Sequence, residues 1–497
     1  MTQRRDRERA ASLGDREAVG HPHARLVLVL LCAAWLRLHA LGRESFWLDE
    51  AYTWYLMLPS WRDSWGVMLL ISDTSPLYYV VARLTTPLIG QSEFALRFVA
   101  LTAGLLAIPV VYRIGKSMLG REIGLWAAWL LAFSPFAVWY ARDARPYGFY
   151  LLFAALALWG FWRWAEQGRG PRLFVLSSAA LYLTHYASAL FAFAQVGYLL
   201  TPWGFRRDPL RFRRWFGWQA LAALPTGLYL LAFLLRRQPV TGNAWIPRAG
   251  LLAPLQTLLN FLSADADRPT WTGVLLALAG AVAFGEALSS SPKTGSRDNL
   301  AKQLLLWWLF LPMFSVWLLS FRLPAYIDRF FTPELIALVL LLGAGLARRA
   351  ANRRVVRFVL YVCAAILCGG MLFASLRLLA GGPRYAKEDW RGAAQFIAAR
   401  YPRAPLLAQD GEVLLGLLPY RASAAGAQRA SPERVEAADR LTVVVLRSPH
   451  DTNHGLSKSA PFDPLVESPL ADWLMAHPER IVAAQRFVGV GVVIVGP

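Results

Sequence analysis

The chain has 497 residues, of which 56% are hydrophobic and 17% are charged. Soluble proteins carry roughly 25% charged and about 45–50% apolar residues, so the composition excludes an ordinary soluble, fibrous or disordered protein. The net charge is +20, and the first 380 residues hold 39 Lys and Arg against 20 Asp and Glu. These cations are scattered over short loops rather than gathered on one face, which argues against nucleic acid as a partner.

Apolar runs recur along residues 25–380, and each is about as long as a helix that crosses a bilayer core of roughly 30 Å. A shorter run at 76–90 begins with a proline and either crosses or lies along the membrane surface. The pattern predicts an all-α polytopic membrane protein with about 11–13 transmembrane helices. The predicted spans are 25–41, 94–115, 122–140, 146–163, 172–185, 187–202, 215–235, 271–290, 303–320, 330–347 and 358–380.

The charges of the loops predict an orientation. If residues 1–24 form a cytoplasmic tail and 76–90 does not cross, the Arg-rich loops fall on the cytoplasmic side, as the positive-inside rule requires. Letting 76–90 cross would place the basic loops at 206–214 and 348–357 outside, which the same rule disfavours. We therefore predict a multi-pass protein of the inner (plasma) membrane, with the first loop, 42–75, on the outer face.

Residues 381–497 differ from the rest of the chain. Their charges nearly balance, with 13 Lys and Arg against 12 Asp and Glu. A helical pattern at Lys387–Arg400 is followed by strand-like apolar runs at 441–446 and 488–495. These features predict a small α/β domain on the outer face, after a cytoplasmic tail at 1–24 and a transmembrane catalytic domain at 25–380.

Acidic residues gather at the predicted outer edge of the membrane. The spans themselves contain only Glu122, Glu286 and Glu334, each at or near an end, so no carboxylate lies mid-membrane to couple ion transport. The acids at the outer edge include Glu44, Asp49, Glu50, Asp63, Asp73, Glu93, Asp143 and Asp328.

The adjacent Asp49 and Glu50 lie in an aromatic stretch, from Phe46 to Trp54. Such a pair is either a solvated part of an interfacial belt or a general base whose pKa is raised by its aromatic surroundings. Asp73, just before Ser75 and Pro76, is compatible with a helix cap as well as with substrate binding.

Three further outer hairpins carry cations or histidine beside aromatic residues. The hairpin at 140–147 contains Arg142, Asp143, Arg145 and Tyr147, which suit either interface anchoring or phosphate binding. A second contains His185, and a lone histidine there is more often structural than a metal ligand. The third, at 326–330, contains Tyr326 and Arg329.

Together these stretches resemble the GT-C membrane glycosyltransferases of the protein mannosyltransferase/aminoarabinose transferase type. The resemblance implies a site on the outer face, a polyprenyl-phosphate-linked sugar donor, inversion at the anomeric carbon, and Asp49 as the catalytic carboxylate. The chain departs from the family pattern at Ser75, often proline, and at Asp143, often glutamate. The stretches that carry the resemblance are Trp47-Leu-Asp-Glu50, Asp73-Thr-Ser-Pro-Leu-Tyr-Tyr79, Glu93-Phe-Ala-Leu-Arg97, Tyr140-Ala-Arg-Asp-Ala-Arg-Pro-Tyr147, Tyr326-Ile-Asp-Arg329 and Glu388-Asp-Trp-Arg391.

The predicted site follows from the chemistry of this donor. A phosphate departs as a stable anion, so one base for the acceptor hydroxyl suffices, with cations to hold the phosphate. We predict Asp49 as the base and Glu50 as its orienting partner or a metal ligand. The predicted substrate contacts are Asp73, Asp143, Tyr147, His185 and Tyr326, and the predicted phosphate-binding residues are Arg97, Arg142, Arg145 and Arg329. No close-spaced ligand motif demands a cofactor, and a divalent metal is a candidate, with Asp49, Glu50, Asp143 and His185 as candidate ligands.

Two alternatives stay open at this point. A lipid-linked glycan transporter or flippase would line a path through the bilayer with polar residues. Charged residues are nearly absent from the middle of the apolar runs, and the exceptions are Arg37 and Arg83. A GT-C enzyme that transfers whole oligosaccharides differs only in its product. The acceptor is a lipid, a glycan or a protein.

Overall fold

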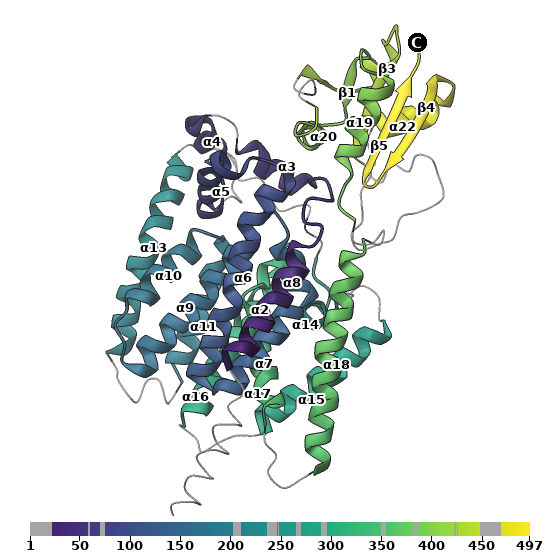
Figure 1. Ribbon diagram of the computed structural model, residues 1–497. Coiled ribbons are helices and arrows are strands. Elements are labelled where there is room, and N and C mark those ends of the chain that lie inside the picture. The colour runs from purple at the N-terminus through teal and green to yellow at the C-terminus, as the bar shows by residue number, and fades with distance from the viewer. Residues whose placement is uncertain are drawn as a thin grey trace, which may run out of the picture.

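The computed structural model is mostly helical, with a small sheet at one end (Figure 1). This confirms the predicted fold class. The described residues are 22–57, 60–69, 75–201, 210–235, 246, 248–264, 270–289, 296–348, 354–381, 386–421, 424, 426–447 and 469–497. Asp73 lies outside them.

Five described helices are long and apolar enough to cross a membrane, and the bent pair α7 and α8 makes a sixth if it is one span. The five are α6 (Glu93–Met118), α13 (Arg211–Leu235), α15 (Trp271–Ser289), α16 (Arg297–Ser320) and α18 (Arg354–Leu379). The other helices of this part are α2 (Pro22–Leu38), α7 (Arg121–Phe133), α8 (Pro135–Ala141), α9 (Tyr147–Gln167), α10 (Arg172–Tyr182), η1 (Tyr186–Ala189), α11 (Leu190–Leu199), α14 (Ala253–Ser263), η2 (Asp328–Phe331) and α17 (Glu334–Leu346).

Prolines explain why several predicted spans are shorter or broken helices. Pro135 begins α8 after a bend of 62° from α7, inside the span predicted at 122–140. Pro333 precedes the first residue of α17, which has 13 residues. Proline fits the start of a helix but disrupts its interior, so Pro135 and Pro333 set helix boundaries within apolar runs.

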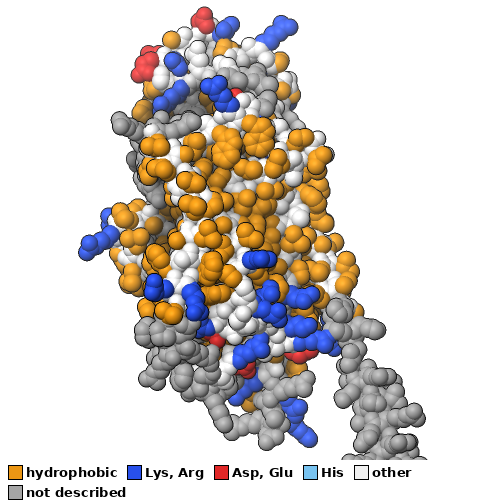
Figure 2. Space-filling view, turned by 90° about the vertical axis from the view of Figure 1, so that its left-hand side faces the viewer, with side chains coloured by type: hydrophobic (Ala, Val, Ile, Leu, Met, Phe, Trp, Pro, Cys, Tyr) orange, Lys and Arg blue, Asp and Glu red, His pale blue; other side chains and the backbone are white. Residues whose placement is uncertain are grey.

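The helical part exposes a belt of hydrophobic side chains, bounded by Lys and Arg at the end away from the sheet (Figure 2). On α13 the exposed leucines recur every three or four residues, and they include Leu221, Leu224, Leu228 and Leu231. An apolar surface of this extent is typical of contact with lipid.

Three helices lie at the other end of the helical part, toward the sheet (Figure 1). They are α3 (Leu48–Tyr55), α4 (Trp61–Met68) and α5 (Pro76–Ile89). With 14 residues, α5 is shorter than the roughly 20 residues that a bilayer crossing needs.

The C-terminal sheet has the strand order β2-β1-β3-β5-β4, in which β1 pairs in parallel with β2 and β3. β5 pairs antiparallel with β3 and β4, and β3 is buried over nearly its whole length. Strands were predicted at 441–446 and 488–495, close to β3 and β5. The elements are α19 (Trp390–Arg400), β1 (Leu406–Ala408), α20 (Gly411–Leu417), β2 (Gln428–Arg429), α21 (Pro432–Glu436), β3 (Thr442–Arg447), α22 (Pro469–Ala476), η4 (Pro478–Arg480), β4 (Ile481–Phe487) and β5 (Val490–Val495).

The crossing of α6 and α9 depends on small residues, and this gives a first testable prediction. A Cβ added at Gly148 would clash with the carbonyl oxygen of Ala100. Gly148→Ala should therefore push the helices apart and destabilise the fold by about 1–3 kcal/mol. Gly285→Ala is the control, because nothing lies within 4 Å of its added Cβ. Thermal unfolding in detergent should show a lower midpoint for Gly148→Ala only, and equal midpoints would contradict this packing.

Candidate active site

Helix α3 turns its two adjacent carboxylates into different surroundings. Successive residues of an α-helix point about 100° apart. The side chain of Glu50 is fully buried, whereas that of Asp49 is 26% exposed. Glu50 also accepts a bond from the backbone N–H of Trp47, which caps the start of the helix.

Glu50 is the centre of a buried network of charges. Its carboxylate accepts hydrogen bonds from Arg97 Nε at 2.8 Å, Arg97 Nη2 at 2.6 Å and the backbone N–H of Ala144 at 2.8 Å. The Lys387 ammonium lies 3.0 Å from Oε1. Burial alone would raise the pKa of Glu50, but the charges of Arg97 and Lys387 hold that pKa at about 2. Glu50 is therefore ionised, and hydrogen bonds and ion pairs within the protein occupy its carboxylate.

Arg97 uses all five of its N–H donors on the protein. Besides the two bonds to Glu50, it donates to the carbonyl oxygens of Leu41, Glu44 and Ser45, each at 2.9 Å. A guanidinium has five donors, so none is left for a phosphate. We therefore replace the predicted phosphate-binding role of Arg97 with a positioning role, in which it ties α6 to the first outer loop.

Lys387 joins the two buried carboxylates, Glu50 and Asp143. Its ammonium is 2.5 Å from Asp143 Oδ1, its side chain is 5% exposed, and it lies 5.7 Å from the centre of the Trp139 ring. Burial and the charge of Glu50 raise the pKa of Asp143, although Lys387 opposes the shift. Asp143 Oδ2 has no hydrogen-bond partner among the described residues.

The candidate metal ligands do not converge. Lys387 fills the space between Glu50 and Asp143 that a bridging cation would take. Within the described ranges, no group of three or more His, Cys, Asp and Glu residues is arranged to hold a metal ion.

Asp49 lies between two arginines. Arg329 Nη1 is 3.2 Å and Arg145 Nε is 3.9 Å from its Oδ2, and Arg145 also donates to the backbone carbonyl of Asp49. The guanidinium of Arg329 lies over the Trp47 ring at 5.9 Å. The structure thus brings together three residues predicted from separate loops: a partly exposed carboxylate and two cations.

His185 lies in an aromatic cluster. It stacks on Tyr150 at 4.6 Å, and the rings of Phe330 and Tyr147 are 5.1 and 6.2 Å away. Its Nδ1 accepts a bond from the backbone N–H of Ala187, so the neutral ring carries its proton on Nε2. Burial lowers the pKa of His185 to about 3, helped by the charges of Arg329 and Arg145, which keeps the ring neutral at pH 7.

Tyr326 is held by a neighbouring helix. Its hydroxyl shares a 2.9 Å hydrogen bond with Thr257 of α14, and Thr257 also donates to Asp328 at 2.7 Å. Asn260 of the same helix bonds Asp328. Among the other predicted substrate contacts, Asp143 belongs to the Glu50 network, and Asp73 lies outside the described residues.

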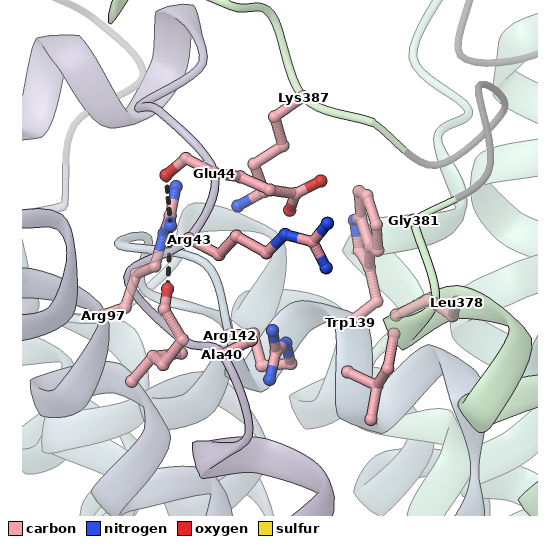
Figure 3. A pocket seen from close by; sticks show the side chains of 11 residues that line it. Ala40, Arg43, Glu44, Arg97, Trp139, Arg142, Leu378, Gly381 and Lys387 are labelled. Atoms are coloured by element: carbon pink, nitrogen blue, oxygen red, sulfur yellow. Dashed lines mark hydrogen bonds between the residues drawn. The ribbon is translucent and has the colours of Figure 1, made fainter.

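Arg142 does not join Arg145 and Arg329 beside Asp49. Its Nη1 donates to the carbonyl oxygens of Leu36, Arg37 and His39, at the C-terminal end of α2. It lines a pocket with Arg97 and Lys387, and Asp49, Arg145 and Arg329 are not among the lining residues (Figure 3). The four predicted arginines thus divide into two pairs.

The C-terminal part attaches directly to the start of α3. Glu388 accepts a bond from the backbone N–H of Leu48 at 2.9 Å and pairs with Arg447. Tyr420 accepts a bond from the backbone N–H of Phe46 and donates to Glu93. The sequence prediction missed Tyr420, Arg447 and Lys387, and only the motif that begins at Glu388 indicated this region.

The contacts of Lys387 with Glu50 and Asp143 lead to a second testable prediction. Lys387→Gln leaves two buried carboxylates without their ammonium, which should destabilise the protein by roughly 3–5 kcal/mol. Adding Asp143→Asn removes one of the charges and should recover part of this loss. Thermal unfolding of both single variants and the double variant measures the coupling. If the two effects simply add, Lys387 and Asp143 do not interact as described.

Comparisons with known proteins agree with the fold. Residues 73–235 match the family model of the dolichyl-phosphate-mannose-protein mannosyltransferases. The crystal structure of ArnT from Cupriavidus metallidurans in the apo state is similar, with a TM-score of 0.62 at 14% identity over 95% of this chain and 98% of that chain. ArnT bound to undecaprenyl phosphate gives 0.61 at 14% identity, over 95% of this chain and 99% of that chain. No curated protein sequence matches. As the sequence resemblance predicted, the chain has the fold of the GT-C membrane glycosyltransferases.

Proposed function

We propose that the chain is an inverting glycosyltransferase that moves a sugar from a polyprenyl-phosphate-linked donor to an acceptor on the outer face of the membrane. The observation that carries this proposal is the partly exposed Asp49 carboxylate beside Arg145 and Arg329. The ArnT structure with undecaprenyl phosphate supports a lipid of this class as the partner. The acceptor is a lipid, a glycan or a protein.

In this mechanism Asp49 removes the proton of the acceptor hydroxyl. The hydroxyl oxygen then bonds to the anomeric carbon as the bond from that carbon to the phosphate oxygen breaks. The bonding electrons leave with the lipid phosphate, which needs no proton because it is a stable anion. Arg145 and Arg329 stabilise its charge. One displacement, with no covalent enzyme intermediate, inverts the anomeric configuration.

The ion pair between Arg329 and Asp49 links donor binding to the role of Asp49 as the base. In the structure Arg329 pairs with Asp49 at 3.2 Å. A phosphate would compete for this guanidinium and release the Asp49 carboxylate to accept the proton of the acceptor hydroxyl. Donor binding would therefore both place the leaving group and free the base from its ion pair.

The remaining residues take positioning and binding roles. Glu50, fixed by Arg97, holds the first turn of α3 so that Asp49 faces outward. We assign His185, Tyr147 and Tyr326 to a wall beside the sugar, since neutral rings pack well on its apolar faces, and keep Asp73 and Asp143 as candidate substrate contacts. Positive charge around the carboxylates comes from side chains here, so no step depends on the candidate divalent metal.

The proposed orientation follows the loop charges and the inner-membrane location. Residues 1–24 form the cytoplasmic tail, 25–380 the transmembrane catalytic domain and 381–497 the domain on the outer face. The band of Lys and Arg at the end opposite the sheet supports this orientation (Figure 2).

The two residues that favoured the transporter alternative, Arg37 and Arg83, both bind backbone carbonyl groups. Arg37 is fully buried and donates to the carbonyl oxygens of Ala33, Leu131 and Ala132. Arg83 donates to the carbonyl oxygen of Leu56. Both arginines bind backbone rather than line a path. Transfer of whole oligosaccharides remains the second candidate, which mass spectrometry of the product distinguishes.

Asp49→Asn tests the proposed base. The amide keeps the shape of the side chain but cannot take a proton, so transfer should fall to below about 1% of the normal rate. The assay measures lipid phosphate released from a panel of polyprenyl-phosphate-linked sugars. Asp63→Asn, on exposed helix α4 of the same loop, is the matched control and should stay active. Near-normal activity of a correctly inserted Asp49→Asn protein would remove Asp49 from this role.

A further inference from the structure

A second group of cations surrounds a pocket that the proposed mechanism does not use. The pocket has a volume of about 120 Å³ and lies among the ends of α2, α8 and α18 and the first outer loop (Figure 3). Its lining residues are Ala40, Leu41, Arg43, Glu44, Arg97, Trp139, Arg142, Leu378, Leu379, Gly381 and Lys387.

Two of its four cations, Arg43 and Arg142, have guanidinium donors that no described residue uses. Arg97 and Lys387 are engaged with the Glu50 network, as described above. Arg43 is exposed, and its guanidinium makes no hydrogen bond or ion pair with any described residue. Arg142 uses Nη1 for the end of α2, and its Nη2 makes no bond within the described part of the chain. Glu44 is the single carboxylate among the described lining residues.

The electrostatics of this pocket favour an anion. Burial lowers the pKa of Arg142 to about 10; the charge of Glu44 opposes this shift and the charge of Arg97 adds to it. A further negative group beside Arg142 would offset the effects of burial and of Arg97. Phosphate suits the position, because guanidinium groups bind its oxygens through charge-assisted and often bidentate hydrogen bonds.

The pocket also meets the apolar surface of the protein. Leu378 and Leu379, at the end of α18, line it directly. One turn earlier, Phe373 and Leu376 are 51% and 39% exposed, and Trp35 of α2 is 54% exposed. A phosphate in the pocket could therefore belong to a lipid whose chains lie along α18 and α2.

We propose that this pocket binds the phosphate group of a membrane lipid, at a second site distinct from the one at Asp49. Arg43 and Arg142 supply the donors, and Leu378 and Leu379 guide the chains. Arg97 and Lys387 separate the two sites, since both line this pocket while bonding Glu50 behind Asp49. The site can hold a polyprenyl phosphate or an anionic phospholipid, which share this chemistry.

Native mass spectrometry of the full-length protein in detergent tests the proposal. Undecaprenyl phosphate, phosphatidylglycerol and inorganic phosphate are titrated separately, and the number and affinity of bound molecules are recorded. Arg43→Gln should weaken one bound lipid by about tenfold or more, as expected for the loss of a charge-assisted bond. Arg43→Lys should keep most of the binding. Arg62→Gln, another exposed arginine of the first outer loop, is the control and should bind as the unmodified protein does.

The three probes separate the sources of the phosphate. Loss of one undecaprenyl phosphate assigns the pocket to the polyprenyl lipid, and loss of phosphatidylglycerol assigns it to a phospholipid. A loss confined to inorganic phosphate would overturn the lipid part of the proposal. If neither Arg43→Gln nor the double variant with Arg142→Gln differs from Arg62→Gln with any probe, the pocket binds no phosphate. Binding is measured without turnover, so this result is independent of whether Asp49 is the base.

Discussion

The structure of the candidate active site depends on one constraint, which is that the buried carboxylate of Glu50 must stay ionised and fully paired. Burying an isolated charge is very unfavourable, so each oxygen needs donors and a compensating cation. These come from distant parts of the chain: Arg97 of α6, the N–H of Ala144 in the hairpin after α8, and Lys387 after α18. The same carboxylate therefore fixes the position of α3 against three other segments.

Fixing Glu50 determines what its neighbour can do. Because α3 presents Glu50 to the core, Asp49 faces away from the core, where Arg145 and Arg329 reach it. In the proposed mechanism, one acid of the motif serves stability and the other serves the chemistry. The C-terminal part enters the same arrangement, since Glu388 bonds the first N–H of α3. Its attachment and the orientation of the proposed base are coupled, so this part is more than a separate cap.

Much of this could be predicted from the sequence, because it rests on local patterns. Long apolar runs indicated a polytopic helical protein, short apolar runs in the C-terminal part indicated strands near β3 and β5, and cations in short predicted outer loops indicated Arg145 and Arg329. Contacts between distant segments could not be predicted. Lys387 is 337 residues from Glu50, and nothing near it indicates a partner. The sequence predicts that Arg97 binds phosphate, because nothing near it in the chain shows that its five N–H donors are already used. Only the fold brings it their acceptors, three backbone carbonyl oxygens and the two carboxylate oxygens of Glu50. Some helices begin at or just after a proline, so they are shorter than the spans predicted from hydropathy alone.

The central claim is that Asp49, Arg145 and Arg329 face the reacting groups of a lipid-linked donor. A cryo-EM structure of the protein with an unreactive analogue of a polyprenyl-phosphate-linked sugar tests it most directly. The account predicts phosphate oxygens within hydrogen-bond distance, about 3 Å, of the Arg145 and Arg329 guanidinium groups. It also predicts that the anomeric carbon faces the side on which Asp49 lies. A donor whose phosphate contacts neither arginine, or whose sugar lies on the far side of the Glu50 network, would contradict it.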